Sequence, residues 1–459
     1  MNSIWPEGKY ELSAASSVEQ PDQTKFVFKI KPNAKFQQLA PTNGRAVTSE
    51  DIAVSFNTYK DDSRSSGVKA VFTQFMEKLE TPDASTVVYT AKAPNAWLLE
   101  PHALAANVPT AFAPKELVAG DQMQKVAVGS GGFHLEAFDP SSQISFTRRP
   151  DGWLDERPYL DRVVYKVISD ATARTAALRS KQLDALDARD KLEAEEFKTF
   201  GAGIRLDREL SYPSVLWMRS DRAPFNDVRV RQAVATVLDI KDLIQRLELG
   251  EGEWTAPVPP HLKKWALPAD EIKPFYPADL KKARDLLTAG GWDFNREVEY
   301  KFANLAKDSL LAEVVQKQLV AVGMKVKLIP QDSVAFSTQT YNVSDFQLCS
   351  SFGSLTGGDA NYFLQYWSTT GSGNGNKTLF SDPELDALIQ KQQIEYDTDK
   401  QLKLLLDLQR TILAKNSSMI LMHAPYTFTG RWDYYHPALA STWGWAGAAG
   451  QHAWMGKKE

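Results

Sequence analysis

The chain of 459 residues contains a single cysteine, Cys349, so no disulfide can form within it. Zinc and iron–sulfur sites that are built on clusters of thiolates are thereby excluded. The six histidines show no HExxH or other paired spacing, and we expect neither a metal nor a cofactor. Because a lone thiol inside the run FQLCSSF is typical of a small core residue, we expect Cys349 to be buried.

The chain also lacks an excess of positive charge and a long apolar run. Its 53 basic and 57 acidic residues leave a net charge of −4, which gives no support to a nucleic-acid partner. No stretch approaches the roughly 20 apolar residues of a membrane-spanning helix. The opening MNSIWPEGKYELSAASS has no basic region followed by an apolar one, so we expect no signal peptide.

Catalytic motifs are scarce as well. The chain has no GxSxG nucleophile elbow. Gly129-Ser-Gly-Gly lacks the Lys-Ser/Thr ending of a phosphate-binding loop and precedes a strand pattern, so we interpret it as a turn. His423 lies in an apolar strand pattern and is predicted to be a satisfied core or hinge histidine. Because a Ser/His pair in a ligand groove needs no recognisable motif, an ester hydrolase remains the alternative function.

One segment, residues 215–250, carries the clearest local signals. An apolar run, VLWM, predicts a strand that breaks before Pro224. Asn226 or Asp227 is then a natural N-cap for an amphipathic helix, and Asp239 offers a second helix start. The segment therefore predicts a buried strand followed by two capped helices.

Strand and helix patterns alternate through the rest of the chain, which favours βαβ-type units and a mixed or parallel sheet. A proline-rich connector covers residues 255–277. One helix is expected to end at Leu186, and another to begin at a cap formed by Thr48 and the three residues that follow. We expect strands at 26–30, 85–90, 133–138, 163–168, 297–302 and 324–329, and a helix at 309–322.

Three separated motifs occur in an order that resembles a known family. They are TSEDIAVSF, YLDRVVYKVISDATARTAALRSKQLDAL and APFNDVRVRQAV. Together they resemble the family 5 extracellular solute-binding proteins, the receptors of peptide, nickel and related ABC importers. Within the third motif we expect Arg229 and Arg231 to be structural ion-pair or capping residues. The first motif stands closer to Met1 than in full-length members. Three explanations are open: the start is misplaced, the sequence is a fragment, or a divergent member has lost the first lobe-one segment along with the signal peptide.

The resemblance implies an α/β fold with two lobes, like the type II, cluster C periplasmic binding proteins, and an additional subdomain in lobe one. The lobes are joined by two crossings, expected near residues 212–217 and 422–428. The implied domains are the extra subdomain at 1–128, a discontinuous lobe one at 129–215 plus 428–459, and lobe two at 216–427.

The resemblance also implies a function: a solute-binding protein of an ABC importer that captures a small-molecule ligand in the cleft between its lobes by hinge closure. Its partner would be the membrane permease of the importer, and a monomer without cofactor is expected. The implied location is periplasmic, or extracellular and membrane-anchored.

Peptide-binding members hold the peptide amine with the aspartate of a Gly-Trp-x-Ala-Asp-Tyr loop, which precedes an Asp-Pro-x-x-Phe-Leu element. Aligning 359–364 with that element places Thr356 at the aspartate position and Gly353 at the tryptophan position. Because a threonine cannot supply a counter-charge to an ammonium group, we expect that ordinary peptides are not the ligand. No catalytic residue is predicted; the candidate ligand-binding residues are Trp217, Trp254, Phe352, Gly353, Ser354, Leu355, Thr356, Tyr426 and Trp443.

Overall fold

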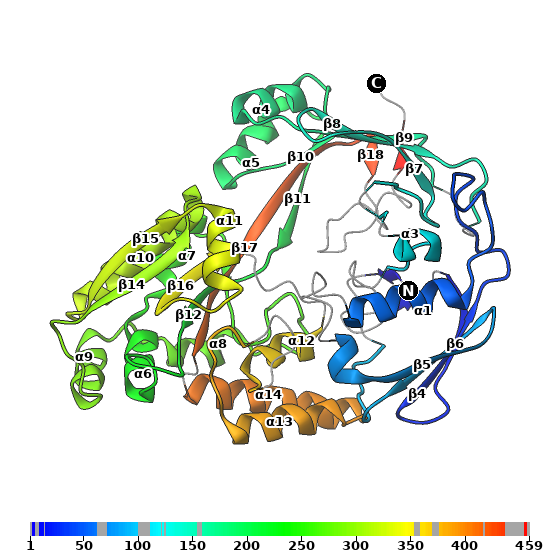
Figure 1. The fold of residues 1–459 in the computed structure, drawn as a ribbon. Coiled ribbons are helices and arrows are strands. Elements are labelled where there is room, and N and C mark those ends of the chain that lie inside the picture. Colours follow the sequence, from blue (N-terminus) through cyan, green and yellow to red (C-terminus); the bar gives the residue numbers. More distant parts are fainter. Residues whose placement is uncertain are drawn as a thin grey trace. The chain divides into compact units, whose positions relative to one another are not determined.

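The chain divides into two compact units (Figure 1). Unit 1 consists of Met1–Arg208 and Phe428–Glu459, and unit 2 is Glu209–Thr427. The chain passes between the units within two strands, β11 (Ile204–Leu210) and β17 (Met419–Trp432). The computed structural model describes residues 2–4, 9–12, 14–61, 71–99, 111–120, 122–123, 125–153, 158–352, 359–369, 376–415, 418–436 and 454–456.

Unit 1 begins with an antiparallel sheet in the order β3-β4-β6-β5, against which α1 packs (Figure 1). The helix is capped as predicted, because the backbone N–H and the hydroxyl of Thr48 both donate to the Asp51 carboxylate at 2.9 Å. Phe26 and Tyr89 are in the core of this sheet. The bounds are β3 Ala15–Glu19, β4 Lys25–Ile30, α1 Ser49–Asp61, β5 Met76–Asp83 and β6 Thr86–Ala91.

A second antiparallel sheet of unit 1, in the order β7-β8-β9, follows the turn at Gly129. Arg149 and Trp153 connect the two sheets: Arg149 donates to the Phe36 carbonyl at 2.8 Å and pairs with Asp151 at 3.0 Å. Trp153 donates to the Ser130 carbonyl. The bounds are β7 Phe133–Asp139, β8 Gln143–Arg148 and β9 Arg162–Lys166.

The prediction that a helix ends at Leu186 is wrong. Helix α4 (Ala171–Arg179) ends earlier, and Lys181 adopts a left-handed φ of 60° that breaks the helix. Residues Ala185–Asp187 instead form strand β10, which pairs antiparallel with the end of β17. Because the partner strand lies far along the chain, the local pattern could not show this pairing. The remaining elements of unit 1 are β1 Asn2–Ile4, β2 Lys9–Glu11, η2 Val71–Phe75, α3 Lys115–Ala119, α5 Lys191–Phe197, η5 Lys198–Phe200, β18 Tyr435–His436 and β19 Trp454–Met455.

Unit 2 is built on a mixed sheet in the order β17-β12-β16-β14-β15, with β13 paired to β17. Strand β14 runs parallel to both β15 and β16, whereas β12 is antiparallel to both of its neighbours. The parallel pair β14–β15 is connected by α10, which packs on these strands and on β16 (Figure 1). The mixed sheet predicted from the alternating patterns is therefore confirmed. The strands are β12 Ser214–Met218, β13 Gly252–Trp254, β14 Glu297–Ala303, β15 Lys325–Gln331 and β16 Leu348–Phe352.

Helices cover this sheet and contribute to one large apolar core. Its members include Leu216 and Met218 of β12, Val298 of β14 and Leu311 of α10, all without exposed surface. Cys349 is also fully buried, as predicted. The helical elements are α6 Val228–Val237, α7 Ile240–Glu248, α8 Ala269–Ile272, η6 Lys273–Phe275, α9 Leu280–Ala289, α10 Ala306–Ala321, α11 Ser333–Ala335, η7 Phe336–Tyr341, α12 Ala360–Leu364, η8 Gln365–Trp367, α13 Pro383–Gln393 and α14 Thr398–Lys415.

The two helix starts predicted after β12 are confirmed. Asp227 accepts from the Arg229 backbone N–H and caps α6, while Asp239 caps α7. The Arg229 guanidinium pairs with Asp227, and Arg231 donates to two backbone carbonyls of the preceding turn. Both arginines are thus structural, as expected. No helix in the described ranges is both long enough and apolar enough to cross a membrane.

Candidate functional site

A chain of polar groups, buried except for Lys307, connects β12, β17, α7 and α10 of unit 2. The Ser214 hydroxyl lies 2.8 Å from Nδ1 of His423, and Nε2 of His423 lies 3.0 Å from Glu248 Oε1. The second carboxylate oxygen of Glu248 pairs with Nζ of Lys307 at 2.8 Å. In one neutral tautomer both ring nitrogens have a hydrogen-bond partner: Nε2–H donates to the carboxylate, and Nδ1 accepts from the hydroxyl. Burial lowers the pKa of His423, although Glu248 opposes this effect.

This Ser–His–Glu set has the residue types of a hydrolytic triad, but its burial is that of a structural network. Ser214 and His423 both have 0% of their surface exposed, so no substrate reaches the serine oxygen in this structure. A nucleophile must contact the carbon that it attacks. The expectation that His423 is a satisfied core histidine is confirmed.

The side chains around the buried network keep part of their surface exposed. Tyr426 on β17 is half-buried, and its hydroxyl donates to Glu253 of β13 at 2.8 Å. Trp254, the next residue of β13, pairs in register with His423 and packs its ring against Tyr276 at 6.5 Å between centroids. Short strand β13 therefore holds Glu253 against the Tyr426 hydroxyl and the Trp254 ring against Tyr276.

Phe352, at the end of β16, joins the same group. Its ring meets the His423 ring edge-on at 6.1 Å, and the Lys307 ammonium lies 4.8 Å from the ring centroid on a face. Burial raises the pKa of the Asp308 carboxyl. The backbone N–H of Phe352, which donates to this carboxylate, opposes that effect. Phe352 is half-buried and held by a cation, a ring and a backbone hydrogen bond.

Trp217 lies on the other face of the sheet and has no exposed surface. Its Nε1–H donates to Ser351 at 3.3 Å, and its ring packs against Tyr341 and Tyr366 at 5.4 and 5.9 Å. The hydroxyls of Tyr366 and Tyr362 lie 3.0 Å apart. In this structure Trp217 thus contacts neighbouring side chains of the protein, and direct contact with a ligand stays an untested prediction.

Sequence reasoning missed several residues that the fold brings into contact within unit 2. Glu253 contacts the predicted site residue Tyr426, and Lys307 contacts Phe352. The rings of Tyr212 and His261 meet edge-on with centroids 6.2 Å apart, and the His261 ring lies 6.0 Å from that of Phe363. The aromatic run ANYFLQYW was a usable signal for Phe363. Nothing local pointed to the other four, because their contacts join elements far apart in the sequence.

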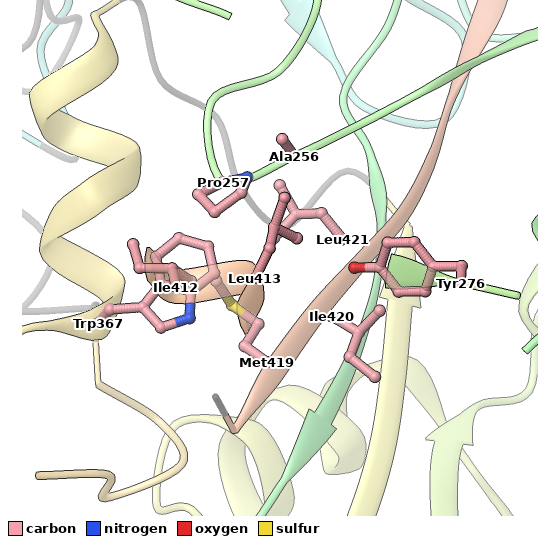
Figure 2. Close-up of a pocket in the computed structure, with 9 residues that line it drawn as sticks. All are labelled: Ala256, Pro257, Tyr276, Trp367, Ile412, Leu413, Met419, Ile420 and Leu421. Atoms are coloured by element: carbon pink, nitrogen blue, oxygen red, sulfur yellow. The ribbon is translucent and has the colours of Figure 1, made fainter. Parts of the chain in front are cut away.

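A small cavity in unit 2 does not suit an organic ligand. Figure 2 shows Trp367, Tyr276, Met419 and Leu421 among the side chains around it. Its volume of about 10 Å³ holds at most one water molecule. The remaining predicted site residues, Gly353, Ser354, Leu355, Thr356 and Trp443, lie outside the described residues. In the described ranges no three His, Cys, Asp or Glu side chains gather as a metal site.

Comparison with protein families gives a match over most of the chain. The family model described as bacterial extracellular solute-binding proteins, family 5 Middle, matches residues 9–375. The oligopeptide-binding protein AppA of Bacillus subtilis is 28% identical over 345 residues, which cover 69% of this chain. The chain spans 60% of the length of that relative.

Solved structures show the same fold at low sequence identity. The periplasmic binding protein DppA of Helicobacter pylori, in complex with the peptide STSA, has a TM-score of 0.84 and 19% identity. That match covers 99% of this chain and 91% of DppA. The protein AgaA of A. tumefaciens R10, in complex with agropinic acid, has a TM-score of 0.81 and 22% identity, covering 97% and 90% of the two chains. The predicted α/β fold of periplasmic-binding-protein type is thereby confirmed.

Proposed function

Because the chain belongs to the bacterial extracellular solute-binding proteins of family 5, we propose that it is the solute-binding protein of an ABC importer. It captures a small ligand between its two lobes by hinge closure and delivers the ligand to the membrane permease. No chemistry is required for this function. The protein acts as a monomer, at a periplasmic or membrane-anchored extracellular location.

One observation carries the proposal at the level of residues. Phe352 and Tyr426 are half-exposed, yet each is fixed by buried or partly buried partners: Lys307 and His423 for the phenyl ring, Glu253 for the phenol. Side chains that are held in place before binding lose little conformational entropy when a ligand arrives. Fixed aromatic surfaces with a few polar neighbours are typical of small-molecule sites.

The domains of the family fold are proposed as residues 1–128 for the extra subdomain, 129–215 plus 428–459 for lobe one, and 216–427 for lobe two. The division of the chain into compact units after Arg208 and after Thr427 supports this assignment.

We propose further that ordinary peptides are not the ligand. Thr356 stands where peptide-binding members have the aspartate that pairs with the peptide amine, and an unpaired buried ammonium is costly. The fold itself accepts other ligands, since AgaA is described in complex with agropinic acid.

Thermal unfolding in the presence of candidate ligands tests both statements. The panel contains the peptide STSA, agropinic acid, a nickel salt and neutral aromatic glucosides and esters. A compound that binds only the folded state at 100 times its Kd adds about 2.7 kcal/mol of stability. We expect a saturable rise in Tm with a non-peptide compound that is recovered intact, and none with STSA.

Two variants connect the binding signal to the site. Phe352→Ala should lower the affinity for the bound compound about tenfold or more. Phe138→Ala, which removes an exposed ring in unit 1, should leave the affinity unchanged. Saturable binding of STSA would contradict the exclusion of peptides. Ester product that forms in proportion to protein, and disappears in Ser214→Ala, would instead establish the hydrolase alternative.

A further inference from the structure

Lys377 is a buried cation without an anionic partner in the described part of the chain. It is 8% exposed, and its ammonium lies 5.2 Å from the ring centroid of Tyr341. The described residues offer it no hydrogen bond and no ion pair. Two other buried cations in the described residues have polar partners: Arg149 pairs with Asp151, and Arg231 donates to two backbone carbonyls, although its Nε has no partner there.

An uncompensated ammonium is costly in this position. Burial lowers the pKa of Lys377, and no charge among the described residues opposes that effect. A cation–π contact offsets only part of the lost hydration. Lysine side chains usually bury their apolar stem and keep the charged end in water. The position therefore favours an anionic partner, which the described residues do not supply.

Lys377 is connected through Tyr341 to Trp217, which is one of the predicted ligand-binding residues. Tyr341 packs on Trp217, and Trp217 contacts both Tyr366 and Ser351. Ser351 directly precedes Phe352, and because successive side chains of a strand point to opposite faces, this group lies on the face of the sheet opposite to the Phe352 ring. Tyr341 is itself half-buried, so this aromatic group extends from the Lys377 ammonium towards partly exposed surface.

We propose that Lys377 recognises an anionic group of the small ligand, a carboxylate or a phosphate monoester. The inference rests on the proposed function and adds the chemical class of the ligand. The Tyr341 ring covers one side of the ammonium, and a charge that is partly removed from water attracts an anion more strongly. Specificity follows, because a neutral ligand would leave the cation uncompensated.

Matched pairs of probes test the proposal by calorimetry on the full chain. The first pair is N-acetyltyrosine and its neutral primary amide, the second is phenyl phosphate and phenyl β-glucoside, and agropinic acid with its methyl ester is the third. We expect at least one anion to bind saturably and about thirtyfold more tightly than its neutral counterpart. The pair that shows this preference distinguishes a carboxylate from a phosphate.

Variants of Lys377 assign the preference to this residue. Lys377→Met, or Lys377→Gln if the first variant fails to fold, should abolish the preference, while Lys377→Arg should retain most of it. Lys377→Met should also unfold at a Tm no lower than that of the wild type, because it removes a buried charge that has no anionic partner in the described ranges. Lys415→Met is the contrast: Lys415 pairs with Asp382 and Glu384, so its loss should lower the Tm.

The outcomes separate this inference from the function on which it rests. If only neutral compounds bind, or if Lys377→Met keeps the preference for the anion, the inference is wrong and the solute-binding function stands. If no compound of either this panel or the wider one binds saturably, both are contradicted.

Discussion

His423 shows at the scale of one residue how the fold converts reactive side chains into structural ones. Its two ring nitrogens are both occupied, by Ser214 and by Glu248, and its ring is closed off from solvent. Removal of the ring would leave a buried hydroxyl and a buried carboxylate with one partner fewer each. The imidazole therefore contributes to stability, and its contribution depends on protonation.

The stability of the protein should fall in mild acid because of this residue. Burial lowers the pKa of His423 below its ordinary value near 6.5, so the unfolded chain binds a proton at a higher pH than the folded chain does. The stabilisation is present above about pH 6.5 and is lost as the pH falls towards the lowered folded-state pKa, by up to about 1.4 kcal/mol per pH unit. Urea unfolding between pH 7.5 and pH 5 measures this slope.

Two variants identify His423 as the source. His423→Gln should be about 1–3 kcal/mol less stable at pH 7.5 and should show a smaller loss towards pH 5. Ser214→Ala keeps the imidazole and should keep most of the pH-dependent loss. An unchanged slope in His423→Gln would assign the acid sensitivity to other groups.

At the scale of elements, caps decide where the helices begin and end. Asp227, Asp239 and Asp279 each accept a backbone N–H at the start of a helix, and all three precede amphipathic patterns in the sequence. The end of α7 is different. Leu249 occupies the left-handed region with a φ of 52°, where a branched side chain is strained, and Gly250 follows with a φ of 84°.

Replacing Leu249 by asparagine should therefore stabilise the protein. Asparagine tolerates the left-handed region, and the Leu249 side chain is 39% exposed, so little apolar packing is lost. We expect Leu249→Asn to raise the free energy of unfolding by about 0.5–1 kcal/mol. Leu310→Asn, at an exposed position inside α10, should lower it by about 0.5 kcal/mol. Equal destabilisation by both changes would show that the αL strain at Leu249 is negligible.

At the scale of the whole molecule, unit 2 has the properties of an independent folding unit. It is one continuous stretch of chain, Glu209–Thr427, and its large apolar core draws only on its own residues. Unit 1, in contrast, needs two separate stretches of chain. A continuous segment with its own core is expected to fold alone.

The fragment 209–427 should accordingly fold without the rest of the chain. We expect a mixed α/β circular-dichroism spectrum and a cooperative thermal transition, with protection of the β12, β14 and β16 amides from hydrogen exchange. The fragment 1–208, which lacks the β17 partner of β10, is the contrast and should be less stable. A fragment 209–427 that is soluble but melts without cooperativity would contradict the independence of unit 2.

Much of the architecture could be predicted from the sequence, because its signals act over a few residues. The cap at Thr48, the starts of α6 and α7, and the strand at 297–302 each follow from side chains that act on their own backbone or from a short repeat of apolar residues. The three ordered motifs indicated the family, and the family match over residues 9–375 agrees. The structural roles of Arg229 and Arg231 were also within reach of local reasoning.

Only the tertiary structure decided the features that depend on contacts between distant residues. The end of α4 was mispredicted because β10 pairs with β17, and the network of Ser214, His423 and Glu248 joins three segments that no local pattern connects. The isolation of Lys377 from every described anion is likewise invisible in its own neighbourhood of the sequence. Sequence patterns report what a segment does to itself, whereas burial and charge compensation depend on which other segments the fold brings next to it.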